Sequence, residues 1–332
     1  MRDHTSNYCT IDASRTRCAR LKDSLSLRKA TLRFPLIFLI CLSLFLSASA
    51  CGTSDGLDER GQSFDFSSIP TNKKIQSMLP QELREKGVLT VGTNAAYAPA
   101  EYTGEDSRVV LGYEIDLIKG IARVMGLKTQ IVQASFNSII PAVGKKYTVG
   151  VSGFTITAER EKSVNFVQHY RSGMSFVVNK GNPKKITVNN LCGRKISVQT
   201  GTMQETDAGT MSEKCLSRGK PAITIRSYRD QPSATIALIS KQVDAMYTDT
   251  PVGEYAVKET EGKLQMLGKA KGVAPMGIVI AKNDMATARA IKAALQILID
   301  RGTYRKILSS WGVTSGIIKK AVINPKLKST AS

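Results

Sequence analysis

The stretch Val151-Ser-Gly-Phe-Thr-Ile-Thr-Ala-Glu-Arg160 joins an apolar strand to a helix through a turn of small residues. Thr155 and Thr157 follow the turn, and Glu159 and Arg160 open the predicted helix. Such a junction exposes backbone N–H donors beside a guanidinium that can form two parallel bonds with a carboxylate. The stretch therefore predicts a site for a small carboxylate. The alternative is that Arg160 only pairs with Glu159 at the surface, where an ion pair contributes little.

Apolar strands and amphipathic helices alternate along the chain after residue 86. The first run begins with the strand Val88–Val91, and the alternation starts again at the strand Lys195–Gln199. Strands that alternate with helices predict sheets with helices on both faces, so two runs predict an α/β protein of two lobes. Ligands of open α/β sheets bind beyond the carboxyl ends of the strands. We therefore expect the site in the loops that follow Val91, Val151, Gln199 and Tyr247.

The N-terminus has the pattern of an export signal. Basic residues precede the apolar run Phe34–Leu46, and the small residues Ser47–Ala50 lead to Cys51. This order is typical of a signal peptide over residues 1–50. A cysteine directly after Ala50 resembles a bacterial lipobox, which predicts lipidation of Cys51 and anchoring on the outer face of the cell membrane. Ordinary cleavage, giving a soluble secreted or periplasmic protein, is the alternative.

Cys192 and Cys215 are the only cysteines after Cys51. A lone pair of cysteines in an exported chain predicts a disulfide, with two buried free thiols as the alternative. Neither residue lies in a Cys-x-x-Cys motif, and His169 is the only histidine after the leader. We therefore expect neither a metal site nor a cofactor.

The formal net charge is +20, from 47 Lys and Arg against 27 Asp and Glu. No basic run is interleaved with aromatic residues, so we do not expect a nucleic-acid partner. The sequence contains neither a Gly-x-x-x-x-Gly-Lys loop nor a Gly-x-Ser-x-Gly motif. A Ser-His-Asp arrangement would depend on His169, which lies in an apolar stretch typical of a strand. None of these enzyme motifs is therefore supported by the sequence.

The segment from about Lys86 to Trp311 resembles the bacterial extracellular solute-binding proteins of the polar amino acid family, family 3, which serve ABC importers. Seven stretches carry this resemblance. Each match alone has little specificity, but the order and spacing of the seven together are specific. The matching stretches are Val91–Tyr102, Gly112–Leu117, Phe136–Ala142, Ser152–Arg160, Gln199–Gln204, Val243–Pro251 and Asp300–Ile307.

The resemblance implies the periplasmic-binding-protein fold of type II, in which a hinge of two chain crossings joins the lobes. We expect the crossings near Arg171–Met174 and Ala274–Gly277. The expected parts are a lipidated Cys and flexible tether over residues 51–83, lobe 1 over residues 84–172 plus 276–318, lobe 2 over residues 173–275, and a C-terminal tail over residues 319–332. The tether is expected to end in a short helical stretch.

The resemblance also implies roles for single residues at the backbone end of an amino acid ligand. Arg160 would bind the α-carboxylate, and the Thr202–Met203 amides would close on it from the other lobe. Asp249 would pair with the α-ammonium group, unless it is an ordinary helix N-cap. The remaining contacts would come from the carbonyl group of Gly153 and from the hydroxyl group and backbone of Thr155.

Four further residues would surround the ligand side chain. Tyr97 and Phe136 match the aromatic positions that enclose it, where rigid rings lose little entropy on binding. Asn94 stands where family members often have Asp, and Gln199 is also neutral. These residues predict a polar amino acid such as glutamine or glutamate rather than a basic one. One departure from the family pattern is Ala100, which replaces the usual Phe and widens the predicted pocket.

The resemblance implies that the chain, as a monomer, captures a free amino acid and delivers it to a membrane permease driven by an ATPase. Some cyclohexadienyl dehydratases share this fold, so an enzyme of that kind is the alternative. A lipid anchor would keep the protein away from intracellular biosynthesis, which favours the transport function.

Overall fold

The computed structural model describes residues 64–104 and 109–327. The chain divides into two units, Met1–Ser54 and Asp55–Ser332, and every described residue belongs to the second unit. The predicted signal peptide and the predicted lipidation at Cys51 therefore lie outside the described residues. Within those residues, no helix has both the length and the hydropathy needed to cross a membrane.

Lobe 1 is built on a short parallel sheet. β1 (Val88–Thr93) lies between β5 (Lys128–Gln133) and β6 (Val149–Gly150) and runs parallel to both. Apolar residues of β1 share one hydrophobic core with helices from both ends of the chain, whereas α5 packs in a separate core. The larger helices of this lobe are α4 (Tyr113–Met125), α5 (Phe136–Ala142), α6 (Ala158–Ser163), α10 (Met285–Asp300) and α11 (Thr303–Ser310).

A small antiparallel sheet lies next to the start of α4. It consists of β2 (Ala96–Tyr97), β3 (Glu101–Thr103) and β4 (Val110–Leu111). Gly112 precedes α4 with φ 133°, and a Cβ atom at this position would collide with the carbonyl oxygen of Ala100. Only glycine allows this close approach. It places the acidic residues of β3 and of the first turn of α4 beside each other.

Lobe 2 has a parallel sheet of its own. β8 (Lys195–Gln199) lies between β9 (Thr224–Tyr228) and β10 (Ala245–Asp249) and is parallel to both. The helices of this lobe are α7 (Met203–Leu216), α8 (Gln231–Ile239) and α9 (Thr250–Glu259). Two hydrophobic clusters hold them, one around the stacked rings of Phe176 and Tyr247.

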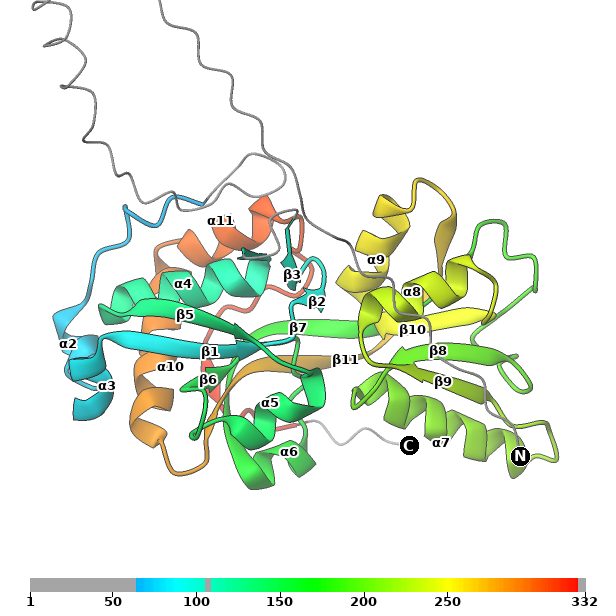
Figure 1. Cartoon of the computed structure of the whole chain (residues 1–332), viewed down its shortest axis with the longest axis horizontal. Helices are drawn as coiled ribbons and strands as arrows, with labels where there is room; N and C mark the ends of the chain where they lie inside the picture. Colours follow the sequence, from blue (N-terminus) through cyan, green and yellow to red (C-terminus); the bar gives the residue numbers. More distant parts are fainter. Residues whose placement is uncertain (1–63, 105–108, 328–332) are drawn as a thin grey trace, which may run out of the picture. The chain divides into compact units, whose positions relative to one another are not determined.

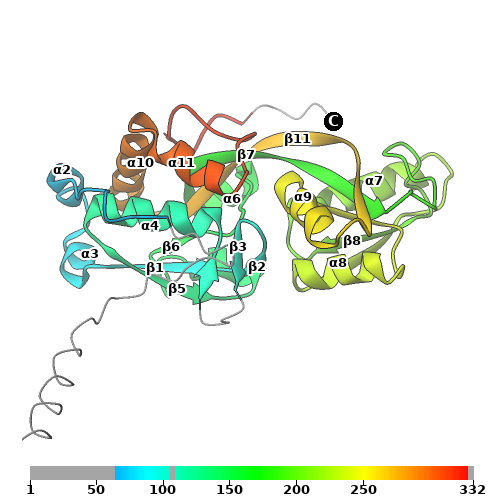
Figure 2. The ribbon, with the colours of Figure 1, turned by 90° about the horizontal axis from the view of Figure 1, so that it is seen from above.

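Two long antiparallel strands, β7 (Val164–Asn179) and β11 (Leu264–Ala281), connect the lobes (Figures 1 and 2). They join both parallel sheets into one, with the order β5-β1-β6-β11-β7-β10-β8-β9. Their pairing shifts register three times between Leu267 and Gly277. Both predicted crossings lie in this irregular part of the ribbon.

The expectation of a flexible tether is wrong for residues 64–74, which are folded, whereas the short helical stretch expected at its end, from Ile75 to Leu83, is present in part. Residues 64–83 contain α2 (Lys73–Gln76) and the start of α3 (Gln81–Lys86), and they pack on lobe 1. Ile69, Ile75 and Leu79 are buried in the lobe 1 core. Their apolar side chains are separated by polar residues, so composition alone resembles that of a linker.

The described part of the predicted C-terminal tail is also folded. β12 (Val322–Ile323) pairs with β7, and Ala321 is fully buried. The side chain of Asn324 accepts a hydrogen bond from the backbone N–H of Phe166 at 2.8 Å. Residues 319–327 therefore belong to lobe 1.

The disulfide between Cys192 and Cys215 is present, with an S–S distance of 2.03 Å and a Cα–Cα distance of 5.6 Å. It ties the loop before β8 to the last turn of α7. The prediction from cysteine number is confirmed.

Candidate functional site

One small cavity brings together residues from both lobes. Eight of the ten predicted site residues line it, together with Gln204, which the sequence analysis missed. The lining residues are Tyr97, Phe136, Gly153, Thr155, Arg160, Thr202, Met203, Gln204 and Asp249. The other two predicted residues, Asn94 and Gln199, are hydrogen-bonded to each other across the lobes at 2.9 Å. The cavity volume is about 10 Å³, so a larger guest requires the lobes to separate.

Arg160 supplies the cation of the cavity. Its backbone N–H is capped by the Thr157 side chain at 3.1 Å, which starts α6 at this point. The guanidinium donates to the carbonyl oxygen of Thr155 at 2.8 Å and, across the lobes, to that of Gly201 at 3.2 Å. Glu159 instead pairs with Lys162 at 2.6 Å. The interpretation of Arg160 as a surface partner of Glu159 is therefore wrong.

Aromatic rings form the wall beside this guanidinium. Phe136 and Phe154 stack with their centroids 4.8 Å apart, and the guanidinium carbon of Arg160 lies 5.7 and 5.8 Å from the two rings. Burial lowers the pKa of Arg160, and the charge of Asp249 opposes this shift. Arginine titrates so far above neutral pH that it stays charged. The wall holds the cation in place without neutralising it.

Asp249 supplies the anion. It ends β10 and occupies the N-cap position of α9, but its side chain caps no backbone N–H. Its two carboxylate oxygens accept hydrogen bonds from the hydroxyl group of Tyr97 at 2.7 Å and the amide of Gln204 at 2.9 Å. Burial raises the pKa of Asp249 to about 6, although both of these hydrogen bonds act to lower it. The N-cap interpretation is wrong, because this carboxylate faces the cavity.

Asn94 and Gln199 form a polar end of the site. The Asn94 amide donates to the carbonyl oxygen of Ala134 at 3.0 Å, and its Oδ1 accepts from Gln199 Nε2 at 2.9 Å. Gln199 is 2% exposed. Its Oε1 is buried and accepts no hydrogen bond from any part of the chain that the structure describes. This end of the site therefore offers an unused acceptor.

His169, weighed above as a possible catalytic base, does not line the cavity. It is 1% exposed, and its Nε2 lies 2.8 Å from Glu114 Oε1. Glu114 in turn accepts a hydrogen bond from the backbone N–H of Gly153 at 2.8 Å. No local sequence pattern indicates this contact, because the three residues come from distant segments.

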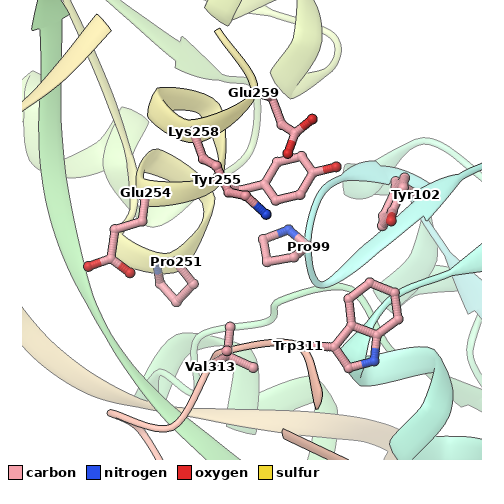
Figure 3. Close-up of a pocket in the computed structure, with 10 residues that line it drawn as sticks. Pro99, Tyr102, Pro251, Glu254, Tyr255, Lys258, Glu259, Trp311 and Val313 are labelled. Atoms are coloured by element: carbon pink, nitrogen blue, oxygen red, sulfur yellow. The ribbon is translucent and has the colours of Figure 1, made fainter. Parts of the chain in front are cut away.

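A larger cavity of about 580 Å³ lies elsewhere between the lobes (Figure 3). Tyr102 and Trp311 contribute from lobe 1, and Glu254 and Tyr255 from α9 of lobe 2. None of the ten predicted residues lines it, and it lacks the opposed arginine and aspartate of the small cavity. We therefore take the small cavity as the candidate site, although the other cavity is much larger.

Comparisons with known proteins agree with this fold. Residues 89–314 match the model of the bacterial extracellular solute-binding proteins, family 3. The arginine-binding protein ArgT of Corynebacterium glutamicum is 35% identical over 254 residues, which are 76% of this chain and 83% of ArgT.

Two solved structures are also similar to the chain. An ancestral arginine-binding protein bound to glutamine has 31% identity and a TM-score of 0.63, over 69% of this chain and 99% of its own. The ancestral amino acid-binding protein AncCDT-1, a precursor of cyclohexadienyl dehydratase, has 31% identity and a TM-score of 0.63, over 69% of this chain and 97% of its own.

Proposed function

The chain belongs to the bacterial extracellular solute-binding proteins, family 3, and on that premise we propose that it binds one α-amino acid between Arg160 and Asp249. The observation that carries this proposal is the placement of a partly buried cation, Arg160, on lobe 1 and a buried anion, Asp249, on lobe 2, both lining one cavity. An α-amino acid has a carboxylate and an ammonium group on one carbon atom. It matches both charges at once, which neither a simple anion nor a simple cation does.

Binding would stabilise the closed arrangement of the lobes. Direct hydrogen bonds now cross between them, among them those from Tyr97 to Asp249, from Gln199 to Asn94 and from Arg160 to Gly201. An amino acid would insert between these groups and place its carboxylate against Arg160 and its ammonium group against Asp249, so that both new contacts join opposite charges. Because a ligand shifts an equilibrium only through contacts that differ between its states, groups on both lobes are what closure needs.

The polar end of the site favours a side chain that donates hydrogen bonds. Gln199 Oε1 has no donor among the described residues, and Asn94 Oδ1 lies beside it. The amide of glutamine or the guanidinium of arginine can donate to these oxygens, whereas the carboxylate of glutamate cannot. We therefore propose glutamine or arginine as the ligand, and we rank glutamate below both.

The names of similar proteins support both members of this pair. ArgT is named for arginine, and the ancestral arginine-binding protein was solved with glutamine. The neutral Asn94 predicts glutamine or glutamate rather than a basic ligand. A guanidinium can nevertheless bind through neutral oxygens when aromatic rings such as those of Tyr97 and Phe136 enclose it.

A thermal-shift panel of the twenty amino acids tests this function. At 100 times the dissociation constant, a ligand stabilises the folded protein by about 2.7 kcal/mol, enough for a clear rise in Tm. We expect the largest rise with glutamine or arginine and little with glutamate. A rise with glutamate alone would contradict the donor argument, and no rise with any amino acid would contradict the function itself.

The same purified protein distinguishes transport from catalysis. One similar solved structure is a precursor of cyclohexadienyl dehydratase, so prephenate and arogenate belong in the assay. We expect no turnover of either compound. Turnover without any amino acid-induced rise in Tm would favour an enzyme.

We further propose that the protein acts at the outer face of the cell membrane, anchored through lipidated Cys51, and delivers its ligand to an ABC permease. The support is the family, together with the small residues before Cys51. Replacing Cys51 by alanine should move most of the protein from the membrane fraction to the soluble extracellular or periplasmic fraction. Cys215→Ala removes a different cysteine and should leave the membrane fraction unchanged. Unchanged fractionation of the Cys51 variant would exclude the anchor.

A further inference from the structure

A buried chain of polar groups lies directly behind the candidate site. It connects Glu101 on β3, Glu114 on α4 and His169 on β7, and each of these residues is at most 1% exposed. Buried carboxylates are costly unless hydrogen bonds and charges compensate them. The proposed function uses none of the three side chains, so their retention in the core requires another explanation.

Glu114 lies at the centre of this network of polar groups. Its Oε1 lies 2.8 Å from His169 Nε2, and its Oε2 accepts the backbone N–H of Gly153 at 2.8 Å. Gly153 has φ 57°, and a Cβ there would lie 3.2 Å from the Tyr97 ring. The carboxylate thus fixes the peptide plane of a left-handed turn that lines the ligand cavity.

Glu101 holds the residue before this turn. Its Oε1 accepts a hydrogen bond from the Ser152 hydroxyl at 3.1 Å, and the same hydroxyl oxygen accepts the backbone N–H of Asn94 at 3.0 Å. The network of polar groups therefore reaches both ends of the site. It holds the turn at Gly153 on one side and, on the other, the backbone of Asn94, whose side chain lies at the polar end of the site.

The pKa values of the two carboxyl groups are shifted in opposite directions. Burial strongly raises the pKa of Glu101, and the charge of Glu114 and a hydrogen bond with it add to the shift. Burial also acts to raise the pKa of Glu114, but the charge and hydrogen bond of His169 and the N–H of Gly153 bring it below its ordinary value. These opposite pKa shifts favour a proton on Glu101 rather than on Glu114.

The hydrogen-bonding pattern agrees with a proton on Glu101. Glu101 Oε2 is buried and receives no hydrogen bond from a donor in the described residues, although Glu114 is within hydrogen-bonding reach of Glu101. Two ionised carboxylates could not pair, whereas one proton on Glu101 completes the contact. Glu114 then accepts three donors: an imidazole N–H, a backbone N–H and the Glu101 O–H.

We propose that Glu114 is a positioning residue for the ligand site: its buried carboxylate holds the turn at Ser152 and Gly153 in the binding conformation, and Glu101 and His169 hold the carboxylate. This inference rests on the proposed function, because binding is the property that the turn serves. The charge of Glu114 also acts on Asp249, so the Glu114 carboxylate adds negative potential where the α-ammonium group would bind.

Two Glu→Gln substitutions should affect the affinity for the amino acid differently. Glu101→Gln preserves the pattern, because its oxygen accepts from Ser152 and its amide donates to Glu114. Glu114→Gln has one acceptor oxygen for three donors and points an N–H at one of them. We expect the dissociation constant of the amino acid found by the panel to rise about tenfold or more in Glu114→Gln, and to change less than about threefold in Glu101→Gln.

Calorimetry well below the Tm of each variant separates positioning from loss of stability, because both proteins are then folded. Two NMR signals give readouts that need no ligand. The ¹⁵N shifts of His169 should show a protonated Nε2 in the wild type and in Glu101→Gln and a change in Glu114→Gln, where the Gly153 amide should also exchange faster with solvent. His4 is the only other histidine in the sequence.

Three results would overturn parts of the inference in different ways. Wild-type affinity in Glu114→Gln, with an unchanged Gly153 amide, would show that the turn does not need the carboxylate. Equal losses in both variants would show that Glu101 is ionised and that the proton assignment is wrong. A wild-type protein that binds no amino acid would refute the proposed function, while the Gly153 and His169 signals would still decide whether Glu114 holds the turn.

Discussion

Replacing Arg160 by alanine should raise the dissociation constant for the amino acid by about two to three orders of magnitude while the protein remains folded. Hydrogen bonds to a charged group contribute about 1.5–3 kcal/mol each, and a bidentate contact with the α-carboxylate loses two. The loss also leaves the ligand carboxylate against the Phe136 and Phe154 rings, which cannot solvate it. Isothermal titration calorimetry measures the affinity, and circular dichroism checks the fold.

Two further variants calibrate this result. Arg160→Lys keeps the charge but not the planar fork, so we expect about a tenfold loss. Lys162→Ala alters the same helix at an exposed position whose partner is Glu159, and it should bind as the wild type does. If Arg160→Ala binds normally, the carboxylate is held elsewhere and the placement of the ligand is wrong.

The regular parts of the fold could be predicted because their residues have a clear period. The apolar positions of α4 recur at helical spacing, and β1, β5 and β8 are short apolar or alternating runs. The crossing strands could be predicted only in part, at the stretch around His169 and at the two expected crossings, and their full length could not. β7 includes Gln168, His169 and Ser172, polar residues that interrupt the pattern of a strand yet are buried. Hydrogen bonds such as that between His169 and Glu114 compensate them, and a single sequence cannot show that partnership.

The candidate site shows the same division between local and distant information. The motif resemblance indicated the ten site residues, and the structure gathers them around one place. Gln204 lies two residues after Thr202 and was missed, because its partner Asp249 is 45 residues away. A residue whose role depends on a distant partner has no local pattern. The neutral Asn94 was visible in the sequence, but the unused oxygen of Gln199 beside it was not.

Affinity for the amino acid should fall as the pH decreases below about 6, by roughly a factor of ten per pH unit. Burial raises the pKa of Asp249 from 3.8 to about 6 in the ligand-free protein, and the α-ammonium group of the ligand requires the ionised carboxylate. Below pH 6 the site must therefore release a proton before it can bind. Calorimetry between pH 4.5 and 8 measures the profile, and buffers of different ionisation enthalpy reveal the released proton.

The variant Asp249→Asn tests whether this carboxylate causes the pH dependence. It should bind about 100-fold or more weakly at pH 7.5, because the ammonium group loses its buried partner, and its remaining affinity should not change near pH 6. Without ligand, the same substitution should increase the stability of the folded protein at pH 7.5, whereas it decreases the affinity for the ligand. Since the folded pKa lies above the unfolded one, ionisation of Asp249 costs folded-state stability as the pH rises through 6, so the variant should have the higher Tm at pH 7.5 and lose that advantage at pH 4.5. A wild-type affinity that stays constant from pH 7.5 to 4.5 would show that Asp249 does not bind the ammonium group.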